Sequence, residues 1–382
     1  MWRNRHQLMS RFAEFNNVMY VEPKVPLNAL RQSLSQKGLK KGMIFKNIFQ
    51  KRVERVLDNL YVYHSPNFIP ISGRFPFSKM TWWAWVLFLK LTLKRLGFHD
   101  PILWFSRPYM INILKCFNAK LKIYHIVDEY SAYGKMNSKE KRRVEKLEQE
   151  MARKSDLVFV VSEELFRAKI RFNKNTYFVP NGVDFELYER TLEDKVHKPS
   201  DIAALPSPII GYSGLISNRL DLGLVEYIAS SRPQWSIAMI GSVSNKCAEA
   251  LNRLCKLENI HFLGLKKYTK VPIYVKAFDI CITPYRITEE TQNLSSLKLY
   301  EYSAMGKPII STNFKSARKV KKIIRIADSK EKFLRCIEDA LLEKDPHLVF
   351  ERRKYASSNT WDRRVTQISK IIQFHLNNGY NI

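Results

Sequence analysis

The sequence predicts an α/β fold made of two doubly wound domains, each with a parallel sheet. Short, β-branched apolar runs alternate with amphipathic helical patterns, which is typical of β-α-β units whose sheets are covered on both faces. The alternation stops in a polar stretch, 184–208, with two prolines near its end, and then begins again. We therefore expect one domain on each side of this stretch, with the carboxyl ends of both sheets facing a shared cleft.

The elements follow in order along the chain. In the first half, the expected strands are 18–22, 59–63, 102–105, 123–127, 157–162 and 176–180, and the expected helices are 5–15, 79–96, 138–153 and 163–172. In the second half, the expected strands are 208–214, 235–241, 260–264, 280–283 and 308–312, and the expected helices are 220–231, 271–278, 296–305, 330–343 and 346–376. The predicted division is an N-terminal domain at 1–184, a linker at 185–207, a C-terminal domain at 208–345, and a C-terminal helix at 346–382 that packs back on the first domain.

Composition and charge exclude several classes of protein. With 382 residues, 45% of them hydrophobic, the chain is neither disordered, nor collagen-like, nor a small disulfide scaffold. The 64 Lys and Arg residues against 36 Asp and Glu give a formal charge of +28. The excess is concentrated in residues 1–100, which hold 17 basic and five acidic residues, whereas 201–300 hold 11 and eight. We expect the first domain to face something anionic, although part of the excess can serve solubility alone.

The cysteines and the apolar segments indicate a reducing compartment and no membrane span. The five cysteines contain no C-x-x-C pair, which argues against a disulfide framework or a zinc site, and Cys281 lies in an apolar run expected to be core. No signal peptide is visible. The longest apolar segment, 80–89, is shorter than the roughly 20 residues that cross a bilayer.

The stretch 284–312 carries the clearest chemistry. Ser295 and Ser296 form a natural N-cap pair before a short helix, and free amides at a helix start bind anions. Lys298 adds a positive charge in the first turn, so this helix start is a candidate phosphate site. Glu301 lies one turn further on, where ribose hydroxyls are suitable hydrogen-bond donors to its carboxylate. The alternative is that Glu301 simply pairs with Lys298.

Five stretches resemble, in order and spacing, the family 4 retaining glycosyltransferases, whose fold is named GT-B. Residues 298–312 resemble the sugar-nucleotide signature of that family, and 181–184 resemble its NGVD loop between the domains. Residues 211–219 resemble its phosphate loop, and 259–264 and 278–285 match two of its strands. No single motif is decisive, but their common order makes the resemblance specific.

The resemblance implies a glycosyltransferase with two Rossmann-like domains that uses a nucleoside-diphosphate sugar and needs no metal or other obligatory cofactor. Residues 2–7 with 21–23 are similar to a branch serving bacterial envelope polysaccharides, teichuronic acid among them. The implied acceptor is a cell-envelope glycan or a polyprenyl-linked acceptor, and the sugar is transferred with retention. Family members begin with a strand and a glycine turn, whereas this sequence begins almost at the first expected helix.

Carried over by position, the resemblance implies a set of donor-binding residues. Glu301 matches the second glutamate of the family's E-x7-E pair and is implied to bind the donor ribose. Arg219 matches the basic residue that holds the diphosphate, and Gly214 lets the backbone approach that group. The backbone amides of Ser295 and Ser296 are implied to meet the phosphates.

The sequence departs from the family at two positions near the sugar. Asn293 stands where the first glutamate of E-x7-E is expected, and Glu289 and Glu290 are the candidates to replace it. Asp128 stands where many members have a histidine, so we expect Asp128 to contact the donor or acceptor sugar, with Glu129 as a second candidate. His125 is expected to be packed within its strand. The residues assigned to catalysis are Asp128, Arg219 and Asn293.

Two basic, aromatic stretches of the first domain suggest a membrane surface. Residues 37–55 hold seven Lys and Arg residues, and we expect them to contact anionic lipid or acceptor phosphates. Residues 80–95 combine three Trp with three basic residues, which fits either an interfacial helix or a buried crossover helix. The expected location is cytoplasmic, peripherally associated with the inner face of the membrane.

Two other functions are weighed against this one. A sugar-nucleotide epimerase with the GT-B fold would need additional acid and base carboxylates in the cleft. A basic nucleic-acid-binding protein is disfavoured, because the charge is poorest where the motifs are densest and no nucleic-acid motif is present. We therefore expect no nucleic-acid partner.

Overall fold

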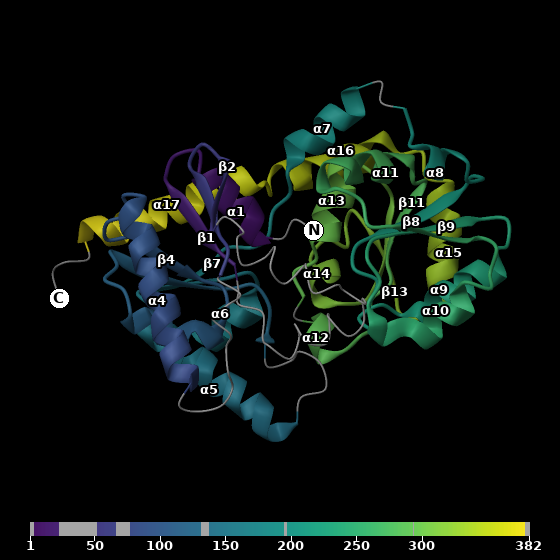
Figure 1. The fold of residues 1–382 in the computed structure, drawn as a ribbon. Coiled ribbons are helices and arrows are strands. Elements are labelled where there is room, and N and C mark those ends of the chain that lie inside the picture. Colours follow the sequence, from purple (N-terminus) through teal and green to yellow (C-terminus); the bar gives the residue numbers. More distant parts are fainter. Residues whose placement is uncertain are drawn as a thin grey trace, which may run out of the picture.

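The protein consists of two lobes that lie side by side, each with a sheet flanked by helices (Figure 1). We call the part built around β1–β7 the first lobe and the part built around β8–β13 the second lobe. The computed structural model describes residues 4–22, 52–65, 77–130, 137–194, 197–292 and 294–378, with side chains omitted at 77–79, 81 and 246.

A four-stranded parallel sheet forms the centre of the first lobe. Its order is β4 (Ile102–Phe105), β5 (Leu121–Ile126), β6 (Leu157–Val160) and β7 (Thr176–Phe178). The connecting elements are η1 (Pro108–Lys115), α5 (Ser138–Lys154) and α6 (Glu163–Lys169). Alternate residues of the strands enter two cores, since Tyr124 and Val158 pack with α5 whereas Ile123 and Leu157 pack on the other face. Burial on both faces explains the near-continuous apolar runs in the sequence.

A second, three-stranded sheet also belongs to the first lobe. Its order is β1 (Val18–Val21), β3 (Leu60–Tyr63) and β2 (Val53–Leu57), and β2 is antiparallel to β3. Strand β2 was not expected, because Val53–Leu57 is mostly exposed and reads as the end of a charged run. The rest of that run, 37–51, lies outside the described residues. Helix α1 (Asn4–Phe12) precedes β1, and α4 (Phe77–Arg95) follows β3.

Helix α4 combines the two alternatives left open for its tryptophan-rich segment. Trp85, Val86 and Leu89 are buried in the core of the first lobe, as a crossover helix requires. Its other face exposes Met80, Trp83, Leu87 and Leu91. In the part of the chain that the structure describes, no helix is both long and apolar enough to cross a membrane.

The second lobe has one six-stranded parallel sheet with the order β10-β9-β8-β11-β12-β13. Its strands are β8 (Ile209–Ser213), β9 (Ser236–Ile240), β10 (Ile260–Gly264), β11 (Ile280–Thr283), β12 (Ile309–Thr312) and β13 (Arg325–Ala327). Its helices are α9 (Leu222–Ser231), η3 (Asn245–Cys247), α10 (Ala248–Leu254), η4 (Tyr268–Lys270), α11 (Val271–Ala277), α12 (Glu289–Gln292), α13 (Leu297–Ala304), α14 (Lys315–Arg318) and α15 (Lys330–Leu341). This is a doubly wound order: successive strands are added on one side from β8 to β10 and on the other side from β11 to β13, so the strand order reverses between β8 and β11, where such sheets bind ligands. Cys281 is fully buried in the core, as expected.

The chain crosses between the lobes twice, and the two crossings lie against each other. The Val183 amide donates to the Asn359 carbonyl (3.0 Å), and the Trp361 amide donates to the Val183 carbonyl (3.1 Å). A Cβ on Gly182 would lie 2.8 Å from the Thr360 backbone, so a larger residue would separate the two segments.

This pairing interrupts the single C-terminal helix that was expected. The stretch instead forms α16 (Pro346–Ser357), which packs against α13, and α17 (Trp361–Asn378), which packs against α1. Figure 1 shows α17 running over the first lobe. The expected linker 185–207 includes two helices, α7 (Phe185–Glu193) and α8 (Ser200–Ala203). The predicted domain boundaries remain a proposal.

Candidate functional site

Two loops meet at the reversal point of the second sheet. One follows β8 and the other follows β11, and Leu220 pairs with Tyr285 between them. The Arg286 amide donates to the Arg219 carbonyl (2.8 Å), and the Asp221 amide donates to the Pro284 carbonyl (2.7 Å). Backbone pairing therefore fixes the loop that carries Arg219 relative to the segment that leads into α13.

Gly214 begins the first of these loops in a conformation that favours glycine, with φ +153°. A Cβ there would lie 2.7 Å from the Tyr212 hydroxyl and 2.9 Å from Cε of Lys298. The Lys298 side chain thus lies directly over the Gly214 backbone. Such contact is what a loop needs if backbone and ammonium group are to share one anion.

Lys298 and Glu301 form an ion pair with 2.8 Å between Nζ and Oε2. The two side chains are only 18% and 11% exposed, so the pair is largely shielded from water. The pairing of Glu301 with Lys298, the alternative to ribose binding, is therefore confirmed. Lys298 nevertheless lies beside Gly214, and the ion pair holds Glu301 next to Lys298.

Ser296 occupies the cap position of α13, but its side chain does not cap the helix. It is buried, and within the described residues its Oγ has no hydrogen-bond partner. The carbonyl of Ser295 accepts a hydrogen bond from Nδ2 of Asn181 (3.0 Å). The expected hydrogen bond of the cap is thus wrong: Ser296 occupies the cap position, but its hydroxyl bonds to none of the described residues.

Arg219 is paired with Glu290. Its Nη2 lies 2.6 Å and its Nε lies 2.8 Å from Oε1 of that carboxylate, with both side chains about three-quarters buried. The structure therefore brings two predicted site residues together, one from each loop. Asn293, the residue predicted to replace the family's first glutamate, lies outside the described residues.

Asp128 and Glu129 follow β5, at the carboxyl end of the first sheet. Glu129 pairs with Lys169 of α6 (3.4 Å), and Lys169 also pairs with the buried Glu148 of α5 (2.9 Å). Burial, partly offset by Lys169, raises the pKa of Glu148 to about 7. Glu129 is therefore held by a buried ion cluster of its own lobe, next to Asp128.

His125 is packed within β5, as expected. It is 1% exposed, and its ring lies edge-on to Trp104 with 5.5 Å between centroids. Neither ring nitrogen has a hydrogen-bond partner among the described residues, and burial lowers the pKa of His125 to about 3. A neutral, enclosed imidazole of this kind is a core residue.

Several polar residues around Glu301 were not predicted from the sequence. Tyr188 of α7 is buried, and burial together with the negative charge of Glu301 raises its pKa well above the ordinary value. The pKa of Tyr268 in η4 is raised in the same way, first by burial and then by the negative charges of Glu301 and Asp184. The signal that could have found Asn181 was the NGVD loop itself, whereas nothing in the sequence marked Tyr188 or Tyr268.

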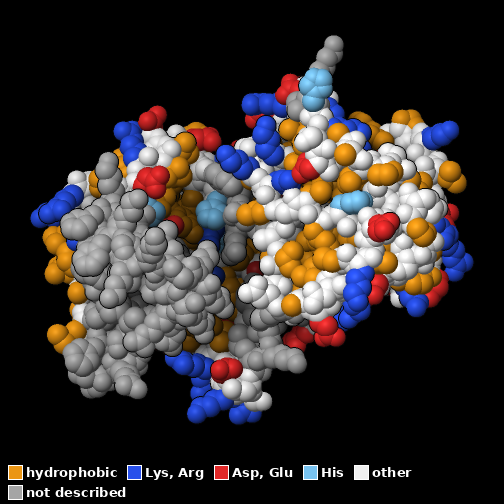
Figure 2. All heavy atoms as spheres, turned by 45° about the vertical axis from the view of Figure 1, so that its right-hand side comes forward, with side chains coloured by type: hydrophobic (Ala, Val, Ile, Leu, Met, Phe, Trp, Pro, Cys, Tyr) orange, Lys and Arg blue, Asp and Glu red, His pale blue; other side chains and the backbone are white. Residues whose placement is uncertain are grey.

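The arrangement combines amides, cations and one buried hydroxyl at a helix start, which suits a phosphate-containing ligand. Figure 2 shows the surface hollowed between the two lobes. No group of three or more metal-ligating side chains is found in the described part of the chain.

Comparison with known proteins agrees with this geometry. Residues 207–342, which hold the second sheet and both loops, match the family model described as glycosyl transferases group 1. The chain is also similar to TuaH of Bacillus subtilis (strain 168), a glycosyltransferase named for teichuronic acid biosynthesis. The two are 25% identical over 282 residues, which cover 70% of each chain.

Solved structures extend the similarity to both lobes. Sucrose-phosphate synthase from Thermosynechococcus elongatus superposes with a TM-score of 0.70 at 15% identity and covers 98% of this chain and 92% of its own. HepE of Anabaena, solved in complex with UDP, gives 0.65 at 15% identity, with 97% and 96% covered. These structural similarities establish the fold of the chain, and the family model covers the second lobe. Residues 207–342 therefore form a group 1 glycosyltransferase domain, and the whole chain has the GT-B fold.

Proposed function

We propose that this enzyme transfers a sugar, with retention, from a nucleoside-diphosphate donor to a cell-envelope glycan or lipid-linked acceptor. The observation that carries the donor assignment is the meeting of Gly214, Lys298 and Glu301 at the reversal point of the second sheet. The buried hydroxyl of Ser296 at the start of α13 supports it.

The chemistry follows from the charge that develops when the glycosidic bond breaks. The leaving nucleoside diphosphate gains negative charge, which the first-turn amides of α13, Lys298 and Arg219 would stabilise. Glu301 would accept hydrogen bonds from the ribose hydroxyls once Lys298 turns toward phosphate. The Arg219–Glu290 pair would open in the same way, since a diphosphate is a stronger partner for a guanidinium than one carboxylate. Asp128 and Asn293 are the groups we assign to the sugar.

Uridine is the base to test first, because HepE has been solved with UDP and with UDP-glucose. A thermal-shift screen of UDP, GDP, ADP and dTDP, followed by calorimetry, identifies the nucleotide. We expect Arg219→Ala and Glu301→Ala each to weaken binding at least tenfold. Unchanged affinity in both variants would remove the site assignment.

Transfer to an acceptor must be separated from epimerisation of the donor. We infer an envelope acceptor from the similarity to TuaH, whose name places it in teichuronic acid biosynthesis. Incubation with the donor sugar alone distinguishes the two activities, because an epimerase converts the donor without an acceptor. An epimerised nucleotide sugar in that reaction would contradict the proposal.

We also propose that the first lobe associates with anionic membranes through α4. Met80, Trp83, Leu87 and Leu91 are spaced three or four residues apart and are 67%, 61%, 57% and 44% exposed. At 100° per residue, these four side chains form one stripe along the helix. The exposed Lys90 falls on one side of the stripe and Arg95 on the other, and the exposed Lys94 lies at the end of the stripe, three residues after Leu91. An apolar stripe with basic flanks is typical of interfacial helices.

Vesicle binding tests this surface. With phosphatidylglycerol vesicles, we expect Trp83→Gln with Leu87→Gln to reduce the bound fraction at least fivefold, whereas phosphatidylcholine vesicles bind neither form. Phe350→Gln is the matched control, because Phe350 is 60% exposed on α16 of the second lobe. Equal binding by the α4 variant and the control would reject α4 as the membrane surface.

A further inference from the structure

Helix α1 has two faces with different partners. Leu8 and Phe12 pack into a core of the first lobe that also contains Trp361 and Val365 of α17. Asn4, Gln7 and Arg11 recur at intervals of three and four residues and form a polar stripe. Asn4 and Gln7 are buried although both are polar, so their hydrogen bonds matter to the fold.

The first end of the stripe reaches the start of the donor-site helix. Asn4 donates from Nδ2 to Oδ1 of Asn181 (2.5 Å), and Asn181 donates from its own Nδ2 to the Ser295 carbonyl (3.0 Å). Leu297, the first residue of α13, packs against the same core as Leu8. One residue of α1 is thus connected through a single side chain to the backbone that precedes α13.

The middle of the stripe reaches Tyr268. A side-chain hydrogen bond joins Gln7 to Tyr268, whose pKa is also affected by the charge of Glu301 nearby. Oε1 of Gln7 accepts from Nη1 of Arg11 (2.7 Å), which leaves the amide NH₂ of Gln7 to donate to Tyr268.

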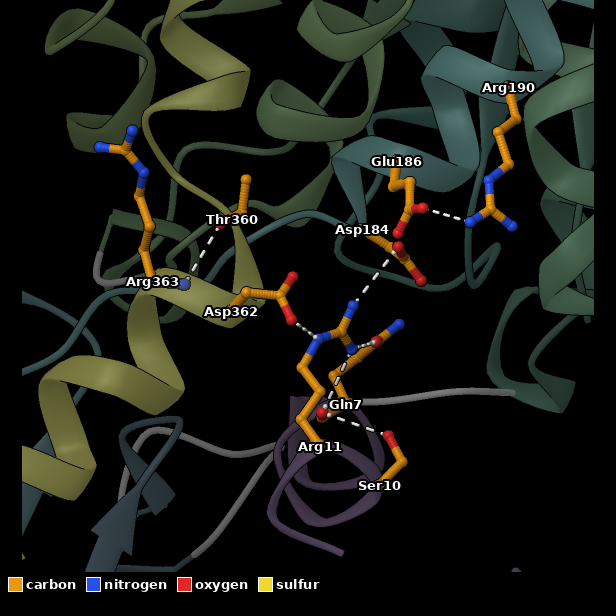
Figure 3. A network of polar contacts seen from close by, with 9 residues as sticks. All are labelled: Gln7, Ser10, Arg11, Asp184, Glu186, Arg190, Thr360, Asp362 and Arg363. Carbon is orange, nitrogen blue, oxygen red and sulfur yellow. Dashed lines mark hydrogen bonds and ion pairs between the residues drawn. The ribbon is translucent and has the colours of Figure 1, made fainter. Parts of the chain in front are cut away.

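The last residue of the stripe holds both chain crossings. Arg11 lies 3.3 Å from Asp184, where the chain enters the second lobe, and 2.8 Å from Asp362, just after it returns. Figure 3 shows the Arg11 guanidinium between these two carboxylates, with Gln7 beneath it and Ser10 turned toward the Gln7 carbonyl. A guanidinium with two carboxylates fixes the crossings to α1 as well as to each other.

We propose that Asn4, Gln7 and Arg11 are positioning residues: this stripe of the first lobe holds Ser295, the start of α13 and Tyr268 in the geometry that binds the donor diphosphate and ribose. This inference rests on the proposed donor site. It adds that the site is complete only when α1 is docked against it, although none of the three residues is assigned a contact with the nucleotide.

The inference predicts a local effect. Without Asn4, the Asn181 side chain that holds the Ser295 carbonyl loses its own hydrogen-bond partner on α1, and without Gln7, Tyr268 loses its hydrogen bond to α1. Helix α17 keeps its contacts with Leu8 and Phe12 in both variants. In hydrogen–deuterium exchange, we expect amides at 295–301 and 268–270 to exchange at least fivefold faster in Asn4→Ala and Gln7→Ala, with amides at 365–372 unchanged. Calorimetry with UDP should show a Kd at least fivefold higher. Tyr268→Phe removes the Gln7 hydrogen bond from the opposite lobe and should reproduce the Gln7→Ala result.

Ser10→Ala is the control, because Ser10 lies on the same helix and, among the described residues, its hydroxyl bonds only to the Gln7 carbonyl. It should match the wild type in both measurements. Exchange at 295–301 that stays at the wild-type rate, or that rises equally at 365–372, overturns the inference, as does a UDP Kd within twofold of wild type in both α1 variants. If the wild type binds none of the four nucleoside diphosphates, the proposed function fails instead, and the exchange result still decides whether α1 positions α13.

Discussion

Arg219 and Glu290 form an ion pair, with 2.6 Å between Nη2 and Oε1, that joins the loop after β8 to α12. Their loops are also joined through the backbone, because Leu220 pairs with Tyr285. The guanidinium proposed to hold the diphosphate is therefore engaged by a carboxylate. Under the proposed function, diphosphate binding would exchange one anionic partner of Arg219 for another, and Glu290 would compete with the phosphates.

The first prediction concerns this competition. Glu290→Gln removes a negative charge beside the proposed diphosphate site, so we expect the Kd for UDP to fall by about threefold to tenfold, a gain of roughly 0.7–1.4 kcal/mol. Sugar transfer should fall in the same variant, since Glu290 is a candidate contact of the sugar. Calorimetry and a transfer assay measure the two effects. A weaker UDP complex would show that Glu290 holds Arg219 in its binding position rather than competing for it.

The second prediction concerns Gly214. An alanine there combines a backbone at φ +153° with contacts of 2.7 Å to the Tyr212 hydroxyl and 2.9 Å to Lys298. We expect Gly214→Ala to lower the free energy of unfolding by about 1–3 kcal/mol and to weaken UDP binding at least tenfold, because Lys298 must move. Gly223→Ala in α9 is the control, since its Cβ would lie 3.4 Å from Asp221 and helix propensity favours alanine there. Equal behaviour of the two variants in calorimetry and denaturation would contradict the role of Gly214.

The strands and the donor loop were predictable because their determinants are local. Residues such as Ile209–Ser213 and Ile280–Thr283 are buried on both faces, and that burial appears in the sequence as continuous apolar runs. The sequence could also predict that Gly214 and Glu301 lie in the same region. The segments that carry them follow β8 and β11, the two neighbouring strands between which the strand order reverses. Strand β2 was not predicted, because Val53–Leu57 is an exposed edge strand in which only Val53 is partly buried.

The contacts that complete the site could not be predicted, because they join residues far apart in sequence. Asn4 and Asn181 are separated by 177 positions, and Arg219 and Glu290 by 71. No local pattern relates such pairs, since their meeting depends on how the two lobes and the two loops are placed. The same holds for the break at Thr360, where the pairing with Val183 ends one helix and begins another in a stretch with helical periodicity throughout.

The third prediction concerns acid stability and His125. The pKa of its buried imidazole is lowered to about 3, whereas the unfolded value is near 6.5, so the stabilisation is complete above pH 6.5 and is lost as the pH falls toward 3. At pH 5 the loss for this one group is about 2 kcal/mol. We expect His125→Phe, which keeps the aromatic contact with Trp104, to reduce the pH dependence of unfolding between pH 7 and pH 5 by about that amount. Denaturation curves at both pH values measure it, and parallel losses in wild type and variant would disprove it.

The fourth prediction concerns the buried cluster behind Glu129. Lys169 pairs with Glu148 and Glu129. The side chains of Lys169 and Glu148 are almost inaccessible to water. Lys169→Met leaves two carboxylates without their cation, so we expect unfolding to become about 3 kcal/mol easier at pH 8. The deficit should shrink toward pH 5, because the pKa of Glu148 is already raised to about 7 and protonation removes its buried charge. Adding Glu148→Gln should restore most of the stability at pH 8. If the double variant is as unstable as Lys169→Met, lost packing of the lysine chain explains the defect, and the uncompensated carboxylate does not.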